Sequence, residues 1–504
     1  MHTPVVGHPD GVDVDRIRRA RDVLRSHDYA DGPIAELLHF DGPAPLSAKT
    51  IPVMVRRTSG GSALETLVRL FIVGIAVDRA AVEAALAPMT VDDWVSLGLL
   101  APGGADGSVL GAVQLRCYQD LVVAFDFTDR PWAHLARDYV MGISVTTLTL
   151  AGLTVRRPCR AALDLGTGSG FQALLAAGHS EQAVAVDRNP RAVGITRFNA
   201  AINGIDNLTA LEGDLFEPVG RRRFDLIVSN PPFVISPESS HWFLHSGMQG
   251  DDMCRRIAAR AGAHLEEGGL CQYLANWVIP EDGSWRERLA GWFDGTGCDA
   301  LVLERGRRQP DEYAASWIEA DAEGLESLTE SLDRWLSYYA DAGIAGMGTG
   351  LITLRRRATG PNWVKISESP DNMTFPCGDE VERTLAARDF LEGTDDAGFL
   401  DVSLRLSPDV RLLREAAARD GRWDTTAAHL RRTVGFQYSG SIDGFGAEVV
   451  LHCDGTRTVR QVLTELAAGL GVEPEAAFTG GVQLMRELVE RGFLLAPGSE
   501  APSV

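Results

Sequence analysis

The chain reads Leu163-Asp164-Leu165-Gly166-Thr167-Gly168-Ser169-Gly170 where an apolar run gives way to a helical pattern over 169–177. Glycines at such a turn let the backbone approach a ligand with no Cβ in the way. The amino terminus of the following helix favours an anionic group such as a carboxylate. Because ligands of open α/β sheets bind at the carboxyl ends of the strands, this segment predicts a ligand-binding loop in an α/β domain.

The spacing of these glycines distinguishes between classes of nucleotide ligand. A dinucleotide fingerprint requires a third small residue at position 171, where this chain has Phe171. The pattern is Gly-x-Gly-x-Gly, which makes a dehydrogenase an unfavourable interpretation and favours a different nucleotide-like cofactor.

Apolar runs alternate with helical patterns from Ala161 to Arg357, which is typical of an open parallel sheet covered by helices on both faces. We therefore predict an α/β fold with a Rossmann-like sheet of seven strands. The predicted strands are 161–165, 183–187, 209–212, 224–229, 269–275, 300–304 and 351–356.

Acidic residues follow the second and third predicted strands. Asp187 stands at a strand tip about twenty residues after the glycine loop, where a carboxylate can accept hydrogen bonds from both ribose hydroxyls. Asp214 would accept from the exocyclic amine of adenine, with Leu215 as an apolar wall. Each position alone also fits a strand-end turn or a helix cap. The predicted cofactor-binding residues are Asp164, Gly166, Thr167, Gly168, Gly170, Asp187, Arg188, Asp214, Leu215 and Asn230.

The fourth predicted strand ends in Asn230-Pro231-Pro232-Phe233. Two prolines cannot continue a ladder and hold Asn230 extended, so its side chain and the Pro231 carbonyl can converge on one NH2 group. Two such bonds orient the delocalised lone pair of a planar nitrogen, and transfer to it then requires mainly positioning. We predict Asn230, Pro231, Pro232 and Phe233 as catalytic residues, with Phe233 packing on the flat acceptor. The alternative is a proline-rich loop that merely ends the strand.

With these motifs, the segment from Ala161 to about Pro237 resembles the glutamine-N5 methyltransferases of peptide-chain release factors. The matching positions are Asp164, Gly166, Gly168, Asp187, Asp214 and Asn230 to Phe233, and Asn199 and Asn203-Gly204 fit the Asn-rich helix end of that family. The resemblance implies a class I methyltransferase domain that uses S-adenosylmethionine and releases S-adenosylhomocysteine.

The implied methyl acceptor is an amide or guanidine nitrogen on a protein side chain or an amino-acid-like small molecule. The Asn-Pro-Pro-Phe/Tyr element also occurs in adenine-N6 and guanine-N2 methyltransferases, so an exocyclic amine of RNA or DNA is the alternative. A non-catalytic binding module that keeps this fold would be favoured by loss of Asp187 or Asn230, and both are present.

The resemblance covers under half of the chain, and the flanking segments are unfamiliar. Residues 1–128 predict helices followed by a hairpin, a winged-helix-like domain, and 129–158 form a connector. The hydroxyl-rich run 142–150 either lines a ligand pocket or forms a short packing helix. The methyltransferase domain spans 159–357, and 358–504 predict an α+β domain with a helix over 409–419 and a winged-helix-like end. The loop 235–252, with Trp242 and several ionisable residues, is either a substrate lid or a surface loop.

Composition limits the class of protein. No apolar stretch reaches membrane-spanning length and no signal peptide is evident, so we expect a cytoplasmic protein. Seven scattered cysteines without a Cys-x-x-Cys spacing argue against zinc and against a disulfide framework, and we predict no metal site. A net charge of -21 makes nucleic acid an unlikely partner overall, although a local basic patch could exist. The oligomeric state stays open.

Overall fold

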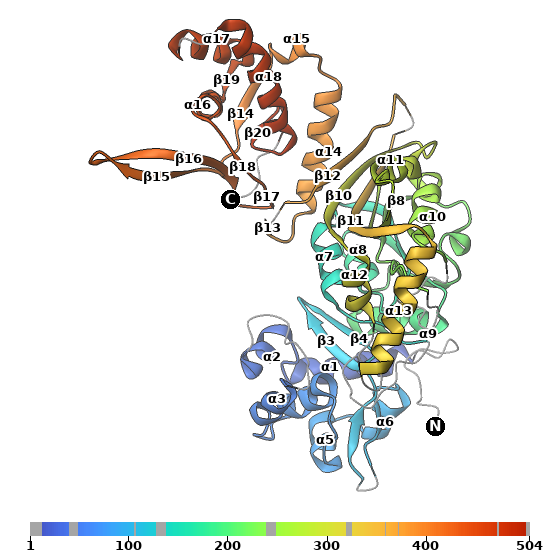
Figure 1. The fold of residues 1–504 in the computed structure, drawn as a ribbon. Helices are drawn as coiled ribbons and strands as arrows, with labels where there is room; N and C mark the ends of the chain where they lie inside the picture. The colour runs from blue at the N-terminus through green and yellow to red at the C-terminus, as the bar shows by residue number, and fades with distance from the viewer. Residues whose placement is uncertain are drawn as a thin grey trace. The chain divides into compact units, whose positions relative to one another are not determined.

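The structure is a computed structural model that describes residues 13–39, 49–104, 107–127, 138–237, 248–318, 325–357, 359–370, 372–470 and 473–499. The chain forms two compact units (Figure 1). The first contains residues 1–150 and 157–367, and the second contains 151–156 and 368–504.

The first unit is built on an eight-stranded sheet with the order β12-β10-β11-β9-β8-β5-β6-β7. Its strands are β5 (Cys159–Leu165), β6 (Ser180–Asp187), β7 (Leu208–Glu212), β8 (Phe224–Ser229), β9 (Leu265–Pro280), β10 (Cys298–Arg308), β11 (Ile344–Arg356) and β12 (Val364–Glu368). Strands β5 to β9 are parallel, and β11 runs antiparallel to both β9 and β10. All seven predicted strands are confirmed as β5 to β11, whereas the edge strand β12 was not predicted.

The order of connection creates a switch point in this sheet. The chain passes from β5 outward to β6 and β7, then returns to the other side of β5 as β8. In such sheets the ligand crevice opens at the carboxyl ends of the strands on either side of the switch. The expected cofactor site therefore lies between the ends of β5 and β8.

Helices cover the sheet. They are α7 (Val145–Leu153), α8 (Phe171–Ala177), α9 (Pro190–Asn203), α10 (Asp252–Ala261), α11 (Trp285–Ala290), α12 (Pro310–Trp317) and α13 (Leu325–Asp341), with short turns η2 (Glu217–Val219), η3 (Gly262–His264) and η4 (Gly291–Phe293). Ile257 of α10 and Leu289 of α11 are fully buried in one core with the strands. Tyr313 of α12 and Tyr339 of α13 form a separate core with Ile235, which follows β8.

The N-terminal part packs on helix α9 and shares a core with it, through Ile195, Phe198 and Ile202. Its elements are α1 (Val14–Ser26), α2 (Asp31–Leu38), α3 (Ile51–Arg57), α4 (Ala63–Val68), η1 (Arg69–Val73), α5 (Arg79–Leu86), α6 (Val91–Ser96), β1 (Leu100–Pro102), β2 (Val109–Gly111), β3 (Gln114–Tyr118) and β4 (Leu121–Phe125). The predicted helices followed by a hairpin are present, and they belong to the same compact unit as the central sheet.

The second unit has its own core of helices and small sheets. Its helices are α14 (Gly378–Glu392), α15 (Asp396–Phe399), α16 (Gly444–His452), α17 (Val459–Leu470) and α18 (Pro474–Glu490). Its strands are β13 (Asn372–Met373), β14 (Ser403–Leu406), β15 (Val410–Arg419), β16 (Arg422–Arg432), β17 (Phe436–Gln437), β18 (Ser439–Ser441), β19 (Asp454–Thr458) and β20 (Leu494–Leu495).

The helix predicted over 409–419 is wrong, because this segment is strand β15. It pairs antiparallel with β16 across a turn at Asp420 and Gly421, whose φ angles are 50° and 77°. An Asp-Gly pair with positive φ at both residues is a strong hairpin signal. Leu, Arg and Ala in the strand favour a helix by intrinsic propensity, and strand pairing overrides that preference.

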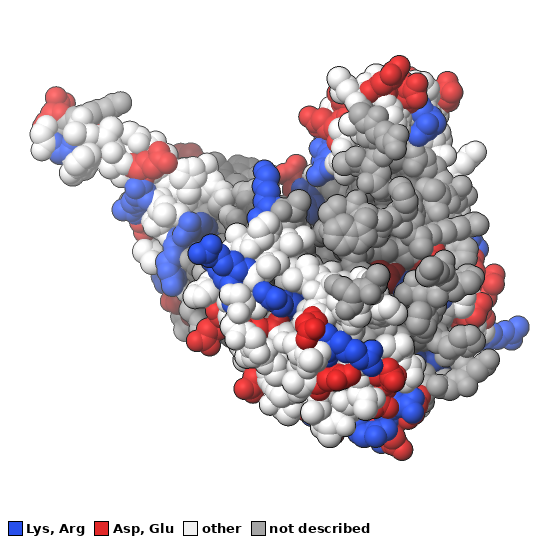
Figure 2. Space-filling model, turned by 90° about the horizontal axis from the view of Figure 1, so that it is seen from below, with Lys and Arg blue, Asp and Glu red and all other residues white. Residues whose placement is uncertain are grey.

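The thiols and surface charges fit a globular protein. All seven cysteines lie in the described ranges and are free, with Cys117 and Cys159 half-buried and the other five buried. Among the described helices, none has the length and apolarity of a membrane span. On the face shown in Figure 2, acidic and basic side chains are interspersed over the described residues.

Candidate active site

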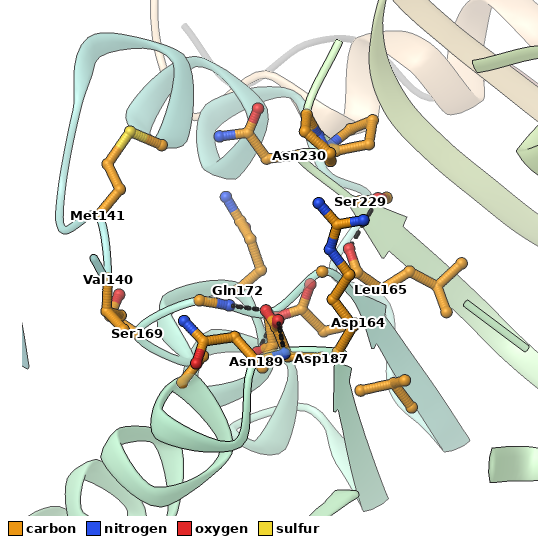
Figure 3. A pocket seen from close by; sticks show the side chains of 18 of the residues that line it. Val140, Met141, Asp164, Leu165, Ser169, Gln172, Asp187, Asn189, Ser229 and Asn230 are labelled. Atoms are coloured by element: carbon orange, nitrogen blue, oxygen red, sulfur yellow. Dashed lines mark hydrogen bonds between the residues drawn. The ribbon is translucent and has the colours of Figure 1, made fainter. Parts of the chain in front are cut away.

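A cavity opens at the carboxyl ends of β5, β6, β7 and β8, at the expected switch point. Its lining includes most of the predicted site residues, namely Asp164, Gly166, Thr167, Gly168, Asp187, Arg188, Asp214, Leu215, Asn230, Pro231 and Pro232. Gly170 and Phe233 are not among the lining residues. Figure 3 shows Asn230 across the cavity from Asp187.

The glycine loop after β5 requires backbone conformations that other residues rarely adopt. Gly166, Gly168 and Gly170 have φ of 68°, 56° and 84°. The amides of Gly166 and Thr167 donate to the Val186 carbonyl at 2.8 and 3.1 Å. Gly170 has a structural role away from the cavity, because a Cβ there would lie 2.9 Å from the Thr196 side chain.

Asp164 holds the loop and the first turn of α8 together. Its Oδ2 accepts hydrogen bonds from the Thr167 hydroxyl at 2.6 Å and from the Ala173 amide at 3.1 Å. Burial raises the pKa of this carboxyl to about 7, since burial disfavours the charged form more than the two hydrogen bonds favour it. Its charge is therefore sensitive to any cation placed in the cavity.

Asp187, at the tip of β6, is bound to the backbone on both sides. Its two oxygens accept from the amides of Gly168 and Asn189, each at 2.9 Å. Burial raises the pKa of Asp187, and these two donors act in the opposite direction. A carboxylate has about four acceptor positions, so each oxygen keeps capacity for one ligand hydroxyl.

The end of β7 contributes an apolar wall and an ion pair. Leu215 adopts a left-handed conformation with φ of 47°, which is strained for a branched side chain, and is 8% exposed. Asp214 forms an ion pair with Arg256, with 3.3 Å between Oδ2 and Nη2. Strain in a cavity-lining residue is typical of a functional site.

Asn230 presents an unsatisfied acceptor to the cavity. Its Nδ2 lies 3.5 Å from the Thr146 hydroxyl, a long hydrogen bond. Its Oδ1 is buried and has no hydrogen-bond partner among the described residues. Leaving a buried acceptor unpaired costs about 1–3 kcal/mol, so this oxygen is suited to a ligand N–H. Beside it, the Ser229 hydroxyl donates to the Leu165 carbonyl at 2.7 Å and ties β8 to β5.

The chain after the Asn-Pro-Pro-Phe motif is fixed by α12 and α13. The hydroxyl of Tyr313 accepts from the Ile235 amide at 3.1 Å, and the hydroxyl of Tyr339 donates to the Ile235 carbonyl at 2.8 Å. Asn276 also donates to Tyr313, at 2.6 Å. The Phe233 ring contacts the Trp317 ring edge-on, with ring centres 6.2 Å apart. From the sequence we had predicted that this ring packs on the methyl acceptor.

Several lining residues were not predicted. Tyr139, Val140, Met141 and Gly142 come from the connector, and Gln172, Asn189 and Met253 come from helices or their caps. For the hydroxyl-rich run 142–150 we had considered either a pocket lining or a short helix. Part of the run lies in helix α7, and Thr147 of that helix lines the cavity. Gln172 donates to the Thr147 carbonyl at 2.8 Å. In the expected lid, residues 238–247 lie outside the described ranges.

Comparison with known proteins identifies the central domain. Residues 144–289 match the family model of the methyltransferase small domain. Residues 27–111 and 382–496 match two domains of unknown function, DUF7059 and DUF7782.

Three curated relatives share the central part. A release factor glutamine methyltransferase of Geobacter sulfurreducens is 36% identical over 29% of this chain and 53% of its own length. A release factor glutamine methyltransferase of Escherichia coli is 42% identical over 34% of this chain and 56% of its own length. A ribosomal protein uL3 glutamine methyltransferase of Bradyrhizobium diazoefficiens is 40% identical over 28% of this chain and 49% of its own length. The chain thus spans about half the length of the relatives that it matches.

The glycine loop, the acidic strand ends and Asn230-Pro231-Pro232 all line one cavity, and they lie within the residues that match the family model. Residues 144–289 therefore carry a methyltransferase small domain, and the chain is similar over about a third of its length to glutamine methyltransferases of release factors and of ribosomal protein uL3.

Proposed function

We propose that this chain is an N-methyltransferase that methylates the amide nitrogen of a glutamine side chain in a protein. The observation that carries the proposal is the buried Oδ1 of Asn230, which has no partner among the described residues and lines the cavity. The relatives are named for glutamine in a release factor and in ribosomal protein uL3, which supports an amide acceptor.

The residues around the cavity fit the cofactor. The loop 166–168 would hold its methionine part, Asp187 would accept from the ribose hydroxyls, and Leu215 would pack on adenine beside Asp214. When bound, S-adenosylmethionine supplies an electrophilic methyl group on a sulfonium. The carboxylate of Asp187 also favours a positively charged ligand in this cavity.

Asn230 and Pro231 would position the acceptor. The Asn230 Oδ1 and the Pro231 carbonyl accept the two N–H groups of a glutamine amide, which turns the face of the nitrogen toward the methyl group. With the cofactor bound, a nitrogen–carbon bond would form as the sulfur–carbon bond of the methyl group breaks, S-adenosylhomocysteine would leave, and the cationic nitrogen would pass one proton to water. Because that cationic nitrogen is far more acidic than a neutral amide, this scheme requires no strong base in the cavity.

The alternative acceptor is an exocyclic amine of RNA or DNA, which predicts a continuous basic stripe beside the domain. The net charge of -21 and the protein substrates for which the relatives are named favour a protein acceptor. Because release factors and ribosomal proteins work in the cytoplasm, the proposal places this enzyme there.

The test is methyl transfer from labelled S-adenosylmethionine to separate samples of release factor, ribosomal protein uL3, total RNA, free glutamine and free arginine. Label on release factor or uL3 supports the proposal. Label on RNA or on a free amino acid, with none on either protein, would replace it with that acceptor.

A further inference from the structure

The hairpin β15–β16 is a basic segment within an acidic unit. Residues 410–432 contain six arginines and three acidic residues. The rest of 368–504 contains seven arginines and twenty acidic residues. A local reversal of sign against the overall charge of -21 indicates a surface for an anionic partner.

One of the six arginines belongs to the core. Arg432 is 2% exposed and pairs with Glu380 at 2.8 Å and with Asp409 at 3.0 Å. The others lie along the ribbon, which Figure 1 shows extending away from the helices of its own unit. Strand β18 adds a third strand at residues 429–431, and the side chains of Arg411, Arg414 and Arg431 are all exposed.

Two arginines face each other across the ribbon. Arg411 and Arg431 are directly opposite in the register of β15 and β16, and like charges in this position destabilise a strand pair. Arg411 donates only to the carbonyls of Pro408 and Val410, and Arg431 has no carboxylate partner among the described residues. An anionic group bound between the two guanidinium groups would remove this repulsion.

Arg414 adds a third exposed charge that has no carboxylate partner in the described part of the chain. It lies on the opposite face of the ribbon from Arg411, because successive residues of a strand alternate between faces. By contrast, Arg422 pairs with Asp424 at 3.0 Å and is already neutralised.

The tip of the hairpin exposes a large aromatic side chain. Trp423 is 76% exposed, next to the turn at Asp420 and Gly421. In the register Trp423 lies opposite Ala418, four residues along β15 from Arg414 and on the same face of the ribbon. An exposed tryptophan and unpaired arginines on one ribbon are the combination that binds single-stranded nucleic acid, since bases stack on the ring while phosphates pair with the cations.

We propose that the hairpin β15–β16 binds single-stranded nucleic acid, with phosphates at Arg411, Arg414 and Arg431 and a base stacked on Trp423. The register places Arg411 and Arg431 on one face, and Arg414 and Trp423 on the other. A flexible strand can contact both faces around the edge of the ribbon, whereas a stiff duplex cannot. This binding is independent of methyl transfer.

The test measures binding of fluorescein-labelled oligouridine to the full chain by fluorescence anisotropy at several salt concentrations. Three phosphate contacts predict that log K falls with log salt with a slope of about -2, given about -0.7 per contact on a single strand. The double variant R411A/R431A should reduce the slope to about -0.7. W423A should weaken binding about tenfold at every salt concentration.

The matched control is R405A/R460A, which removes two arginines of the same unit outside the hairpin and should leave binding unchanged. The proposal is overturned if wild type does not bind at low salt, if R411A/R431A binds as wild type does, or if a duplex of the same length binds as tightly. Equal competition by polyglutamate would also overturn it, in favour of an acidic protein partner. Circular dichroism checks that each variant is folded.

Discussion

At the scale of single residues, a change at Asn230 should separate methyl transfer from cofactor binding, because its Oδ1 has no partner among the described residues. Asn230→Ala removes Oδ1 and leaves the glycine loop and Asp187 in place. Loss of one positioning hydrogen bond at a reacting centre costs about 10²–10³ in kcat. We expect a fall of at least about a hundredfold, with the Kd of S-adenosylmethionine unchanged by calorimetry.

A matched asparagine serves as the control for this prediction. Asn207 donates to the carbonyls of Ala177 and Ser180 and does not line the cavity. Asn207→Ala should lower stability and leave kcat near wild type. An equal fall of cofactor affinity and kcat in Asn230→Ala would contradict its proposed role.

The pKa of Asp164 predicts that cofactor affinity depends on pH. Burial raises this pKa to about 7, so the carboxyl is partly protonated at neutral pH without ligand. A cationic ligand favours the carboxylate and lowers its pKa, so binding releases protons and affinity rises from about pH 6 to 8. Asp164→Asn should reduce this rise in calorimetric titrations, and a full rise in that variant would rule Asp164 out as its source.

The position of a predicted site residue could be predicted where it follows from local chain position. Asp187 ends strand β6 and Asn230 directly follows strand β8, and both line the cavity. Phe233 lies only three residues beyond Asn230, yet its ring contacts Trp317 of α12. Because α12 is distant from Phe233 in the sequence, the local sequence pattern could not predict this contact.

At the scale of elements, helices α12 and α13 position the motif loop through two tyrosines. Tyr313 and Tyr339 bind the amide and carbonyl of Ile235, which is 0% exposed. Tyr339→Phe leaves that carbonyl without its donor, a cost of about 1–3 kcal/mol that movement of the loop would relieve. We expect kcat to fall about tenfold while the Kd of the cofactor stays constant.

Tyr338→Phe is the comparison for this variant. Its hydroxyl accepts from the Gly250 amide at 3.0 Å, at the other end of the loop, and it should reduce kcat less. If Tyr339→Phe lowered stability and left kcat unchanged, the tyrosine would support the core without positioning Asn230.

Helix α9 links the N-terminal hairpin to the glycine loop after β5 through a buried asparagine. Asn199 accepts from the Ala124 amide at 2.8 Å and donates to the carbonyls of Ala124 at 2.9 Å and Ser169 at 2.8 Å. Asn199→Ala leaves these buried groups unpaired, so we expect a loss of at least about 2 kcal/mol in urea unfolding. Asn203→Ala, at a half-buried position with bonds to Val122, should cost less. An equal or smaller loss in Asn199→Ala would contradict this link.

Helices and strands were predicted from the spacing of apolar residues. This prediction failed for a segment in which strand pairing outweighs the intrinsic preference for a helix. The predicted strands β5 to β11 are confirmed. They could be predicted because many of their residues are apolar, as expected for strands that are buried in the sheet. Strand β15 was taken for a helix because Leu, Arg and Ala dominate it, although Asp420-Gly421 carried the hairpin signal. Strand β12 is short and half-exposed, so its sequence carries little apolar pattern.

At the scale of the whole molecule, the methyltransferase domain is one part of a larger chain. The matched relatives share about half their length with it, and the flanking segments match domains of unknown function. The N-terminal part shares its core with α9, so removal of residues 1–127 would expose Ile195, Phe198 and Ile202. Tests of activity therefore require the full chain.

We propose that the full chain methylates a glutamine amide in a protein. The most direct measurement is mass spectrometry of purified release factor after incubation with S-adenosylmethionine and either wild type or Asn230→Ala. We predict a gain of one methyl group on a glutamine side chain with wild type, and none with the variant. A methyl group on another residue type, or equal methylation by both proteins, would contradict the account.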